Sequence, residues 1–177
     1  MATPSSSIST NRVTRNTAGR DGTRPSTDAE NHCMTTKPQR SDYPYLHPIT
    51  TRWHDNDIYG HINNVTYYAF FDSAVNSWLI NEGGLDIHHG EKVAFVVSSG
   101  CDYFQPVAFP EQIEIGVRVA RLGSSSVHYE LALFKSGVAE ACAAGRFVHV
   151  FVERAGNRAC PIPPGPRAAL ERLLVSD

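Results

Sequence analysis

One helical pattern dominates the sequence and limits the folds that are open to it. Over residues 65 to about 81, large apolar side chains recur with the 3.6-residue period of an α-helix. Further apolar residues widen this stripe around most of the circumference, which is typical of a buried helix. Asn63 or Asn64 can cap the start, and the pair Gly83 and Gly84 can end the helix. We therefore predict one long, buried helix.

The rest of the globular sequence predicts β-strands. A first strand is expected ahead of the helix, at residues 47–54. Four more follow the helix as alternating or continuous apolar runs, at 93–104, 113–119, 127–133 and 147–152. The turns between the later strands are short and contain glycine and serine, which favours antiparallel hairpins. A short helix at 167–175 completes the pattern.

This order of elements indicates an α+β domain. One helix cannot cover both faces of a sheet, so the economical arrangement wraps an antiparallel sheet around the helix. Such a sheet leaves exposed edges, and pairing an edge with a second copy satisfies its free backbone groups. We therefore expect a homo-oligomer, at least a dimer.

The N-terminal part differs in composition from the rest. Residues 1–41 are rich in Ser, Thr, Asn and Arg and contain few large apolar side chains to offset the entropy of folding. We predict a disordered tail over 1–41 and one folded domain over 42–177. The first twenty residues contain three arginines and no acid, which would also suit a mitochondrial or other organelle transit peptide in a eukaryote.

Composition excludes several classes of function. The 177 residues are 41% hydrophobic, which is enough for one core, and the net charge of −2 gives no strong attraction to nucleic acid or anionic membranes. No apolar run approaches the roughly 18 residues of a membrane-spanning helix. The four cysteines form no Cys-x-x-Cys pair, which favours a reducing compartment. We expect a cytoplasmic protein, with an organelle as the alternative.

The densest group of ionisable residues lies between the first predicted strand and the helix. Residues 52–64 read Arg-Trp-His-Asp-Asn-Asp-Ile-Tyr-Gly-His-Ile-Asn-Asn. A helix start presents unpaired N–H groups and a partial positive charge, which can polarise a carbonyl or hold an oxyanion. A carboxylate a few residues earlier can act beside that carbonyl as nucleophile or base. The segment therefore contains the minimum set of groups for acyl transfer.

Metal chemistry fits this segment less well. Asp55 and Asp57 begin like a calcium loop, but Thr66 stands at the position where a bidentate Glu is required. His54 and His61 do not have the spacing of a zinc motif with these acids. We expect no metal site. From spacing alone, plain turn and helix-cap chemistry stays open as an alternative to a catalytic role.

The run from Arg52 to Tyr67 resembles the signature of the 4-hydroxybenzoyl-CoA thioesterase-like family. The pattern is Arg-Trp-x-Asp-x-Asp-x-x-Gly-His-x-Asn-Asn-x-x-Tyr, and every specified position matches. Weaker similarity extends over about 47–155. Asp55 matches as well, and we expect it to be a structural hydrogen-bond acceptor beside Arg52.

This resemblance implies a hot-dog fold, in which an antiparallel sheet wraps a long central helix. Members are homodimers or tetramers with active sites at subunit interfaces. It implies an acyl-CoA thioesterase, which hydrolyses a fatty or aromatic acyl-CoA to free acid and CoA. No cofactor is expected, because the thioester is already activated and CoA enters only as part of the substrate. An acyl-carrier-protein thioesterase and a non-hydrolytic acyl-binding protein are the alternatives.

The resemblance also assigns roles within the signature and the helix. Asp57 takes the place of the catalytic carboxylate, as nucleophile or as general base. The backbone N–H that polarises the thioester carbonyl falls at or next to Asn64. His61 is a further catalytic candidate, and Asn63 shapes the loop at the substrate. Asp72 corresponds to an acidic position that positions water or braces the loop.

Further substrate contacts are implied outside the signature. Arg121, Ser124 and Ser125 fall in the turn where relatives touch the CoA phosphates, although ordinary turn residues are the alternative. Basic and hydroxyl groups suit phosphate oxygens. Ser98 and Ser99 fall on the strand that faces the helix start in relatives, where they are candidates for contact with the acyl group.

Overall fold

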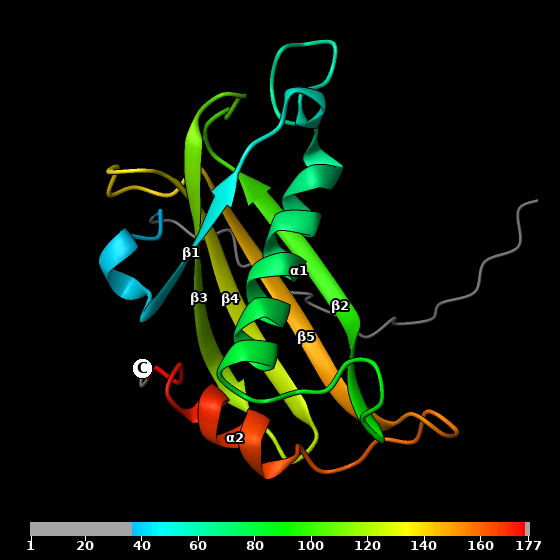
Figure 1. The fold of residues 1–177 in the computed structure, drawn as a ribbon. Helices are drawn as coiled ribbons and strands as arrows, with labels where there is room; N and C mark the ends of the chain where they lie inside the picture. The colour runs from blue at the N-terminus through cyan, green and yellow to red at the C-terminus, as the bar shows by residue number, and fades with distance from the viewer. Residues whose placement is uncertain (1–36, 176–177) are drawn as a thin grey trace, which may run out of the picture. The chain divides into compact units, whose positions relative to one another are not determined.

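The structure is a computed structural model that describes residues 37–175 (Figure 1). Five strands form one antiparallel sheet in the spatial order β1-β3-β4-β5-β2, and a long helix lies against one face of it. This arrangement confirms the predicted hot-dog fold. The elements are β1 (Tyr45–Thr50), α1 (Asn64–Asn81), β2 (Lys92–Tyr103), β3 (Gln112–Leu122), β4 (Ser126–Lys135), β5 (Ala143–Glu153) and α2 (Pro164–Glu171).

The predicted elements differ from the observed ones mainly at their ends. The first strand ends at Thr50 rather than at residue 54, because Trp53–Asp55 form a 3-10 turn. The last helix begins at Pro164, earlier than the predicted residue 167, and ends at Glu171. Proline is well suited to the first turn of a helix, where its fixed φ is helical and its missing N–H costs no hydrogen bond.

Helix α1 has the predicted length and packs closely on the sheet. Its buried residues include Phe71, which is fully covered. Gly145 on β5 lies directly beneath this ring, since a Cβ at that position would come within 2.6 Å of a Phe71 ring carbon. The close approach therefore requires glycine at 145. The helix is not covered all round, because the Val65 side chain is 66% exposed.

Both ends of α1 are fixed by the residues that the sequence indicated. The Asn63 side chain accepts a hydrogen bond from the Val65 N–H at 3.2 Å, which caps the helix start. At the other end Gly84 adopts a φ of 64°, a left-handed conformation that glycine takes without strain. The backbone N–H of Leu85 then reaches back to the Leu79 carbonyl at 3.0 Å.

The last residues of the predicted tail belong to the folded part. The Pro38 carbonyl accepts a hydrogen bond from the Ala141 N–H at 3.0 Å. The Arg40 guanidinium holds the Glu114 carboxylate through two hydrogen bonds of 2.9 Å. Ordered structure thus begins before residue 42, which corrects the predicted boundary.

Residues 1–36 and 176–177 lie outside the described residues, and with them most of the predicted tail and its arginines. Within the described part of the chain, no helix is both long enough and apolar enough to cross a membrane.

The two edges of the sheet differ in length and character. Edge strand β2 has twelve residues and exposes Phe95, Val96 and Val97. Its register with β5 shifts between Val96 and Ser98, so Val97 forms a bulge. The opposite edge strand, β1, has six residues and contains Pro48, which cannot donate a ladder hydrogen bond. A long, exposed apolar edge such as β2 normally pairs with another strand.

His149 is buried inside the core. The side chain is 1% exposed, and its ring lies 5.1 Å from that of Tyr129 on β4. Neither ring nitrogen has a hydrogen-bond partner among the described residues. Burial lowers the pKa of His149 to about 4, because the charged imidazolium would lose its hydration.

We predict that the folded state weakens as the pH falls from about 6.5 to about 4. In this window the unfolded chain binds a proton at residue 149 and the folded chain does not, so the free energy of unfolding falls by up to about 3 kcal/mol. Urea unfolding at several pH values measures the slope. His149→Leu should remove the part of this pH dependence that the histidine contributes. An identical slope in the wild type and the variant would contradict the prediction.

Candidate active site

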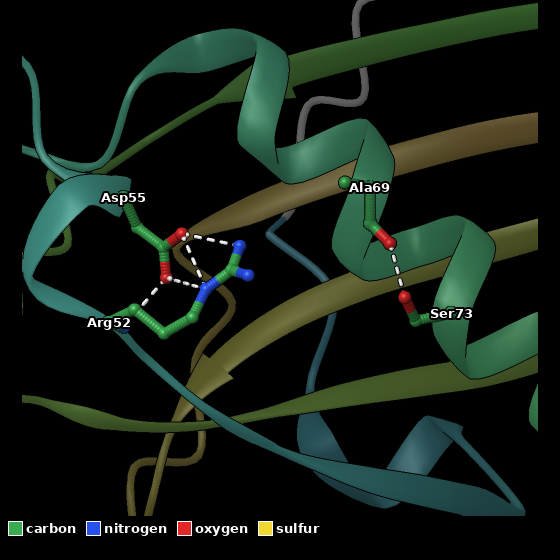
Figure 2. A network of polar contacts seen from close by, with 4 residues as sticks. All are labelled: Arg52, Asp55, Ala69 and Ser73. Atoms are coloured by element: carbon green, nitrogen blue, oxygen red, sulfur yellow. Dashed lines mark hydrogen bonds and ion pairs between the residues drawn. The ribbon is translucent and has the colours of Figure 1, made fainter.

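The loop between β1 and α1 is closed at its base by an ion pair. The Asp55 carboxylate is 2% exposed, and it accepts hydrogen bonds from the Arg52 backbone N–H at 2.7 Å and from Arg52 Nη2 at 2.9 Å (Figure 2). The Asp55 carbonyl also accepts the Asn63 N–H at 2.9 Å. This acid therefore braces the turn that leads into the helix, as predicted, and its oxygens are not free for chemistry.

Asp57 lies at the tip of the same loop. Its Oδ1 accepts the Tyr59 N–H at 2.8 Å, and its backbone N–H donates to the His61 carbonyl at 2.8 Å. Gly60 completes the tight turn with a φ of 83°. Oδ2 of Asp57 has no hydrogen-bond partner within residues 37–175. The loop thus holds one carboxylate oxygen in place and leaves the other available.

The start of α1 opens into a pocket of about 300 Å³. Within the described residues, the Asn64 N–H donates no hydrogen bond, so this donor at the positive end of the helix is available. The Tyr103 hydroxyl donates to the Asn64 carbonyl at 3.1 Å, which fixes the ring beside the helix start. The lining is mainly apolar and includes His61, Ile62, Asn64, Tyr67, Tyr103 and Phe104.

The two tyrosines of the pocket wall, Tyr67 and Tyr103, are neutral at physiological pH. Burial raises the pKa of Tyr67 to about 12 and also raises the pKa of Tyr103. Burial likewise raises the pKa of the Cys101 thiol to about 11, on the same face of β2 as Tyr103. Because a protonated thiol is a poor nucleophile, Cys101 does not rival the loop carboxylate.

The three predicted catalytic residues are only partly brought together. His61 and Asn64 line the pocket, whereas Asp57 does not. Asp57 stays with the exposed loop tip, where the Ile58 and Tyr59 side chains are 93% and 80% exposed. Two large, solvent-exposed apolar side chains are typical of a surface that contacts another molecule.

Two other signature and helix residues have distinct positions. Asn63 uses its side-chain oxygen for the helix cap, so that atom is not free to bind substrate. Asp72 is exposed on α1, and its Oδ1 accepts from Asn76 Nδ2 at 3.0 Å. It shares one flank of the helix with Tyr68, whose ring stacks on Phe147 of β5 at 6.2 Å. This flank therefore faces the β5–β2 side of the sheet.

The exposed surface of α1 continues beyond this flank. There the Ser73 hydroxyl donates to the Ala69 carbonyl at 2.7 Å, one turn earlier in the helix (Figure 2). Such a bond satisfies the hydroxyl locally. Ser73 is accordingly a helix-surface residue rather than a candidate for substrate binding.

The two serines of β2 lie on opposite faces of the sheet. Ser99 pairs with Phe147, whose ring faces α1, so Ser99 lies on the helix side. Ser98 pairs with Val148 and points to the outer face. A separate hollow of about 400 Å³ is lined by both serines. Because neighbouring strand residues alternate between faces, only Ser99 fits the predicted contact with an acyl group.

The predicted phosphate contacts lie at the other end of the sheet. Arg121, Ser124 and Ser125 are at or next to the turn between β3 and β4, whereas Asn64 is near the opposite ends of these strands (Figure 1). A strand of this length spans roughly 35 Å. The turn also packs on the C-terminal segment, since the Arg167 guanidinium donates to the Gly123 carbonyl at 2.6 Å. Within one chain these residues do not approach the Asp57 loop.

Sequence reasoning missed the wall formed by Tyr103. The signal was the alternation of Cys101 and Tyr103 at the end of a predicted strand, which places both on the helix side. It also missed how the loop is anchored: Asn56 Oδ1 accepts the Phe109 N–H at 3.0 Å, and the Ile62 N–H donates to the Val107 carbonyl at 2.7 Å. In the part of the chain described here, no three His, Cys, Asp or Glu residues are grouped as a metal site.

Comparisons with known proteins agree with this geometry. The model of the thioesterase-like superfamily matches residues 51–170. The crystal structure of the PA5185 protein from Pseudomonas aeruginosa is 66% identical, covers 80% of this chain and 99% of its own, and superposes with a TM-score of 0.79. A Thermus thermophilus thioesterase complexed with coenzyme A and Zn is 28% identical, with coverages of 75% and 95% and a TM-score of 0.62.

A curated relative adds to this group. The uncharacterized protein YsmA of Bacillus subtilis is 27% identical over 122 residues, which are 68% of this chain and 80% of YsmA. The superfamily match is broader than the 4-hydroxybenzoyl-CoA family that the signature resembles, and it includes the signature loop, helix α1 and strands β2 to β5. The chain therefore belongs to the thioesterase-like superfamily and has its hot-dog fold.

Proposed function

We propose that this protein is an acyl-CoA thioesterase that hydrolyses a fatty or aromatic acyl-CoA to the free acid and CoA. The observation that carries the proposal is the available Asn64 N–H at the start of α1, in a mainly apolar pocket beside the carboxylate loop. Membership of the superfamily supports thioester hydrolysis. The relative from Thermus thermophilus, a thioesterase that binds coenzyme A, supports CoA as the thiol.

The groups around the pocket suffice for the proposed reaction. The thioester carbonyl accepts a hydrogen bond from the Asn64 N–H, which stabilises the oxyanion as the carbonyl carbon becomes tetrahedral. The Asp57 carboxylate attacks that carbon or removes a proton from the attacking water. Collapse breaks the C–S bond, and the CoA thiolate takes up a proton, for which His61 in the pocket lining is a candidate carrier. Where Asp57 is the nucleophile, water then hydrolyses the acyl anhydride on Asp57, which releases the free acid and restores the carboxylate. Asp72 positions water from the helix flank.

The proposed site is completed by a second subunit. Edge strand β2 exposes Phe95, Val96 and Val97, and the neighbouring helix flank exposes Val65. Antiparallel pairing of β2 with its copy would continue the sheet and cover these side chains. It would also bring the partner's surface toward the loop tip that carries Asp57. We therefore propose a homodimer as the smallest active unit, with a tetramer as the larger alternative.

Light scattering coupled to size exclusion should show at least twice the mass of one chain. Val97→Lys places a charge on the bulged β2 edge, where the native side chain is 61% exposed. It should favour the monomer and lower thioesterase activity, because a buried unpaired charge opposes association. Val138→Lys, at a 42% exposed position outside β2, is the matched control. A monomeric wild type with full activity would refute the dimer.

Asp57→Asn should lower kcat by at least about a hundredfold, because it removes the basicity of the carboxylate and keeps its size. The melting temperature should change little, since Asn can still accept the Tyr59 hydrogen bond. Release of free thiol from a panel of acyl-CoAs measures kcat, and thermal unfolding measures stability.

Asp55→Asn is the matched comparison for this test. It weakens the pair with Arg52, so it should lower the free energy of unfolding by about 1–3 kcal/mol and act less on kcat. Near-normal turnover in Asp57→Asn together with an inactive but stable Asp55→Asn would show that the wrong acid has been chosen.

A further inference from the structure

A further cavity lies at the end of the sheet that is remote from the pocket. Its volume is about 510 Å³, and it is formed where β2 begins and β5 ends (Figure 1). Three cationic side chains line it, Lys92, Arg154 and Arg158. His89 and the carboxylates of Glu91 and Glu153 also line it.

The cations of this cavity outnumber its carboxylates by three to two. Arg158 holds Glu153 at 2.9 Å, which neutralises that acid. Arg154 donates only to neutral acceptors, the carbonyls of Gly90 at 2.8 Å and Ile87 at 2.9 Å, so its charge is fixed in place but not compensated. Lys92 is half-buried and has no ion-pair partner within residues 37–175. Such groups suit the oxygens of a phosphate ester.

Within one chain this cavity is too far from the pocket to bind the same substrate molecule. Lys92 and Tyr103 are the first and last residues of β2, which spans roughly 40 Å at the usual rise per residue. In two β2 strands paired antiparallel, the beginning of one strand lies beside the end of the other. The cationic cavity of one subunit is then next to the pocket of its partner.

We propose that this cavity binds the nucleotide phosphates of an acyl-CoA whose thioester lies in the pocket of the other subunit. The proposal rests on the proposed function and its β2-paired dimer, and it names the part of the substrate that each subunit holds. It replaces Arg121, Ser124 and Ser125 as the expected phosphate contacts.

Substrates with and without the nucleotide test the assignment. In the double variant Lys92→Ala/Arg154→Ala, the KM for an acyl-CoA should rise at least about tenfold, since each lost charge-assisted contact weakens binding. The KM for the corresponding acyl-pantetheine should not change, because that thioester lacks the phosphates. Arg146→Ala removes an exposed cation from the outer face and should leave both values unchanged. A rise with Arg121→Ala and none with the double variant would overturn the proposal.

Mixed dimers test which subunit contributes the cavity that binds the phosphates. Asp57→Asn and Lys92→Ala/Arg154→Ala are each expected to be defective at low acyl-CoA concentration. If the cavity acts across the interface, a mixed dimer contains one fully native site, and an equimolar mixture recovers roughly a quarter of wild-type activity. If the cavity acts within its own subunit, no native site forms and no activity returns, which would overturn the proposal.

Binding of CoA itself, measured by calorimetry, separates this inference from the proposed function. Weaker CoA binding by the double variant than by the wild type supports the cavity even if no thioester is hydrolysed. Equal CoA affinity in the two proteins, or no binding to either, overturns the cavity assignment whether or not hydrolysis is observed.

Discussion

The contact of Phe71 with Gly145 sets the geometry on which the rest of the site depends. Because residue 145 has no side chain, the helix lies directly on the sheet, and the neighbouring inward residues of β3, β4 and β5 close around it. The start of α1 is thereby held at one end of the sheet, beside Tyr103 at the end of β2. A helix raised by one methyl group would move its N–H donors away from that wall. Core packing and the position of the helix start are therefore one constraint.

The sequence predicted those features that arise from local chemistry. The helix period, the Asn63 cap and the structural part of Asp55 each depend on residues within a few positions of one another. Placement across the sheet could not be predicted in the same way. Ser98 and Ser99 are adjacent in sequence but face opposite sides, and the assignment of a side requires the strand register. Arg121 was assigned by resemblance alone, and only the topology shows that its end of the sheet is remote from Asp57.

Each end of the sheet contains part of what a bulky, highly charged substrate requires. One end has an apolar pocket with a free N–H donor, and the other has cations that are not fully compensated. In a dimer paired antiparallel through β2, the apolar pocket of each subunit would lie beside the cationic cavity of the other. Such an arrangement would explain why a single chain exposes the loop tip and the strand edge that an isolated domain would cover.

The bulge at Val97 limits which strands can pair with β2. A regular strand from another protein cannot form an uninterrupted ladder along β2, because the bulge takes one residue out of register. A second copy has the same irregularity at the symmetric position, so its edge matches. Once the two copies pair, only the short β1 edges remain, and Pro48 removes a donor from each. In the proposed dimer the sheet would thus close as a finite particle instead of growing into a fibre, which would protect the protein from aggregation through its strands.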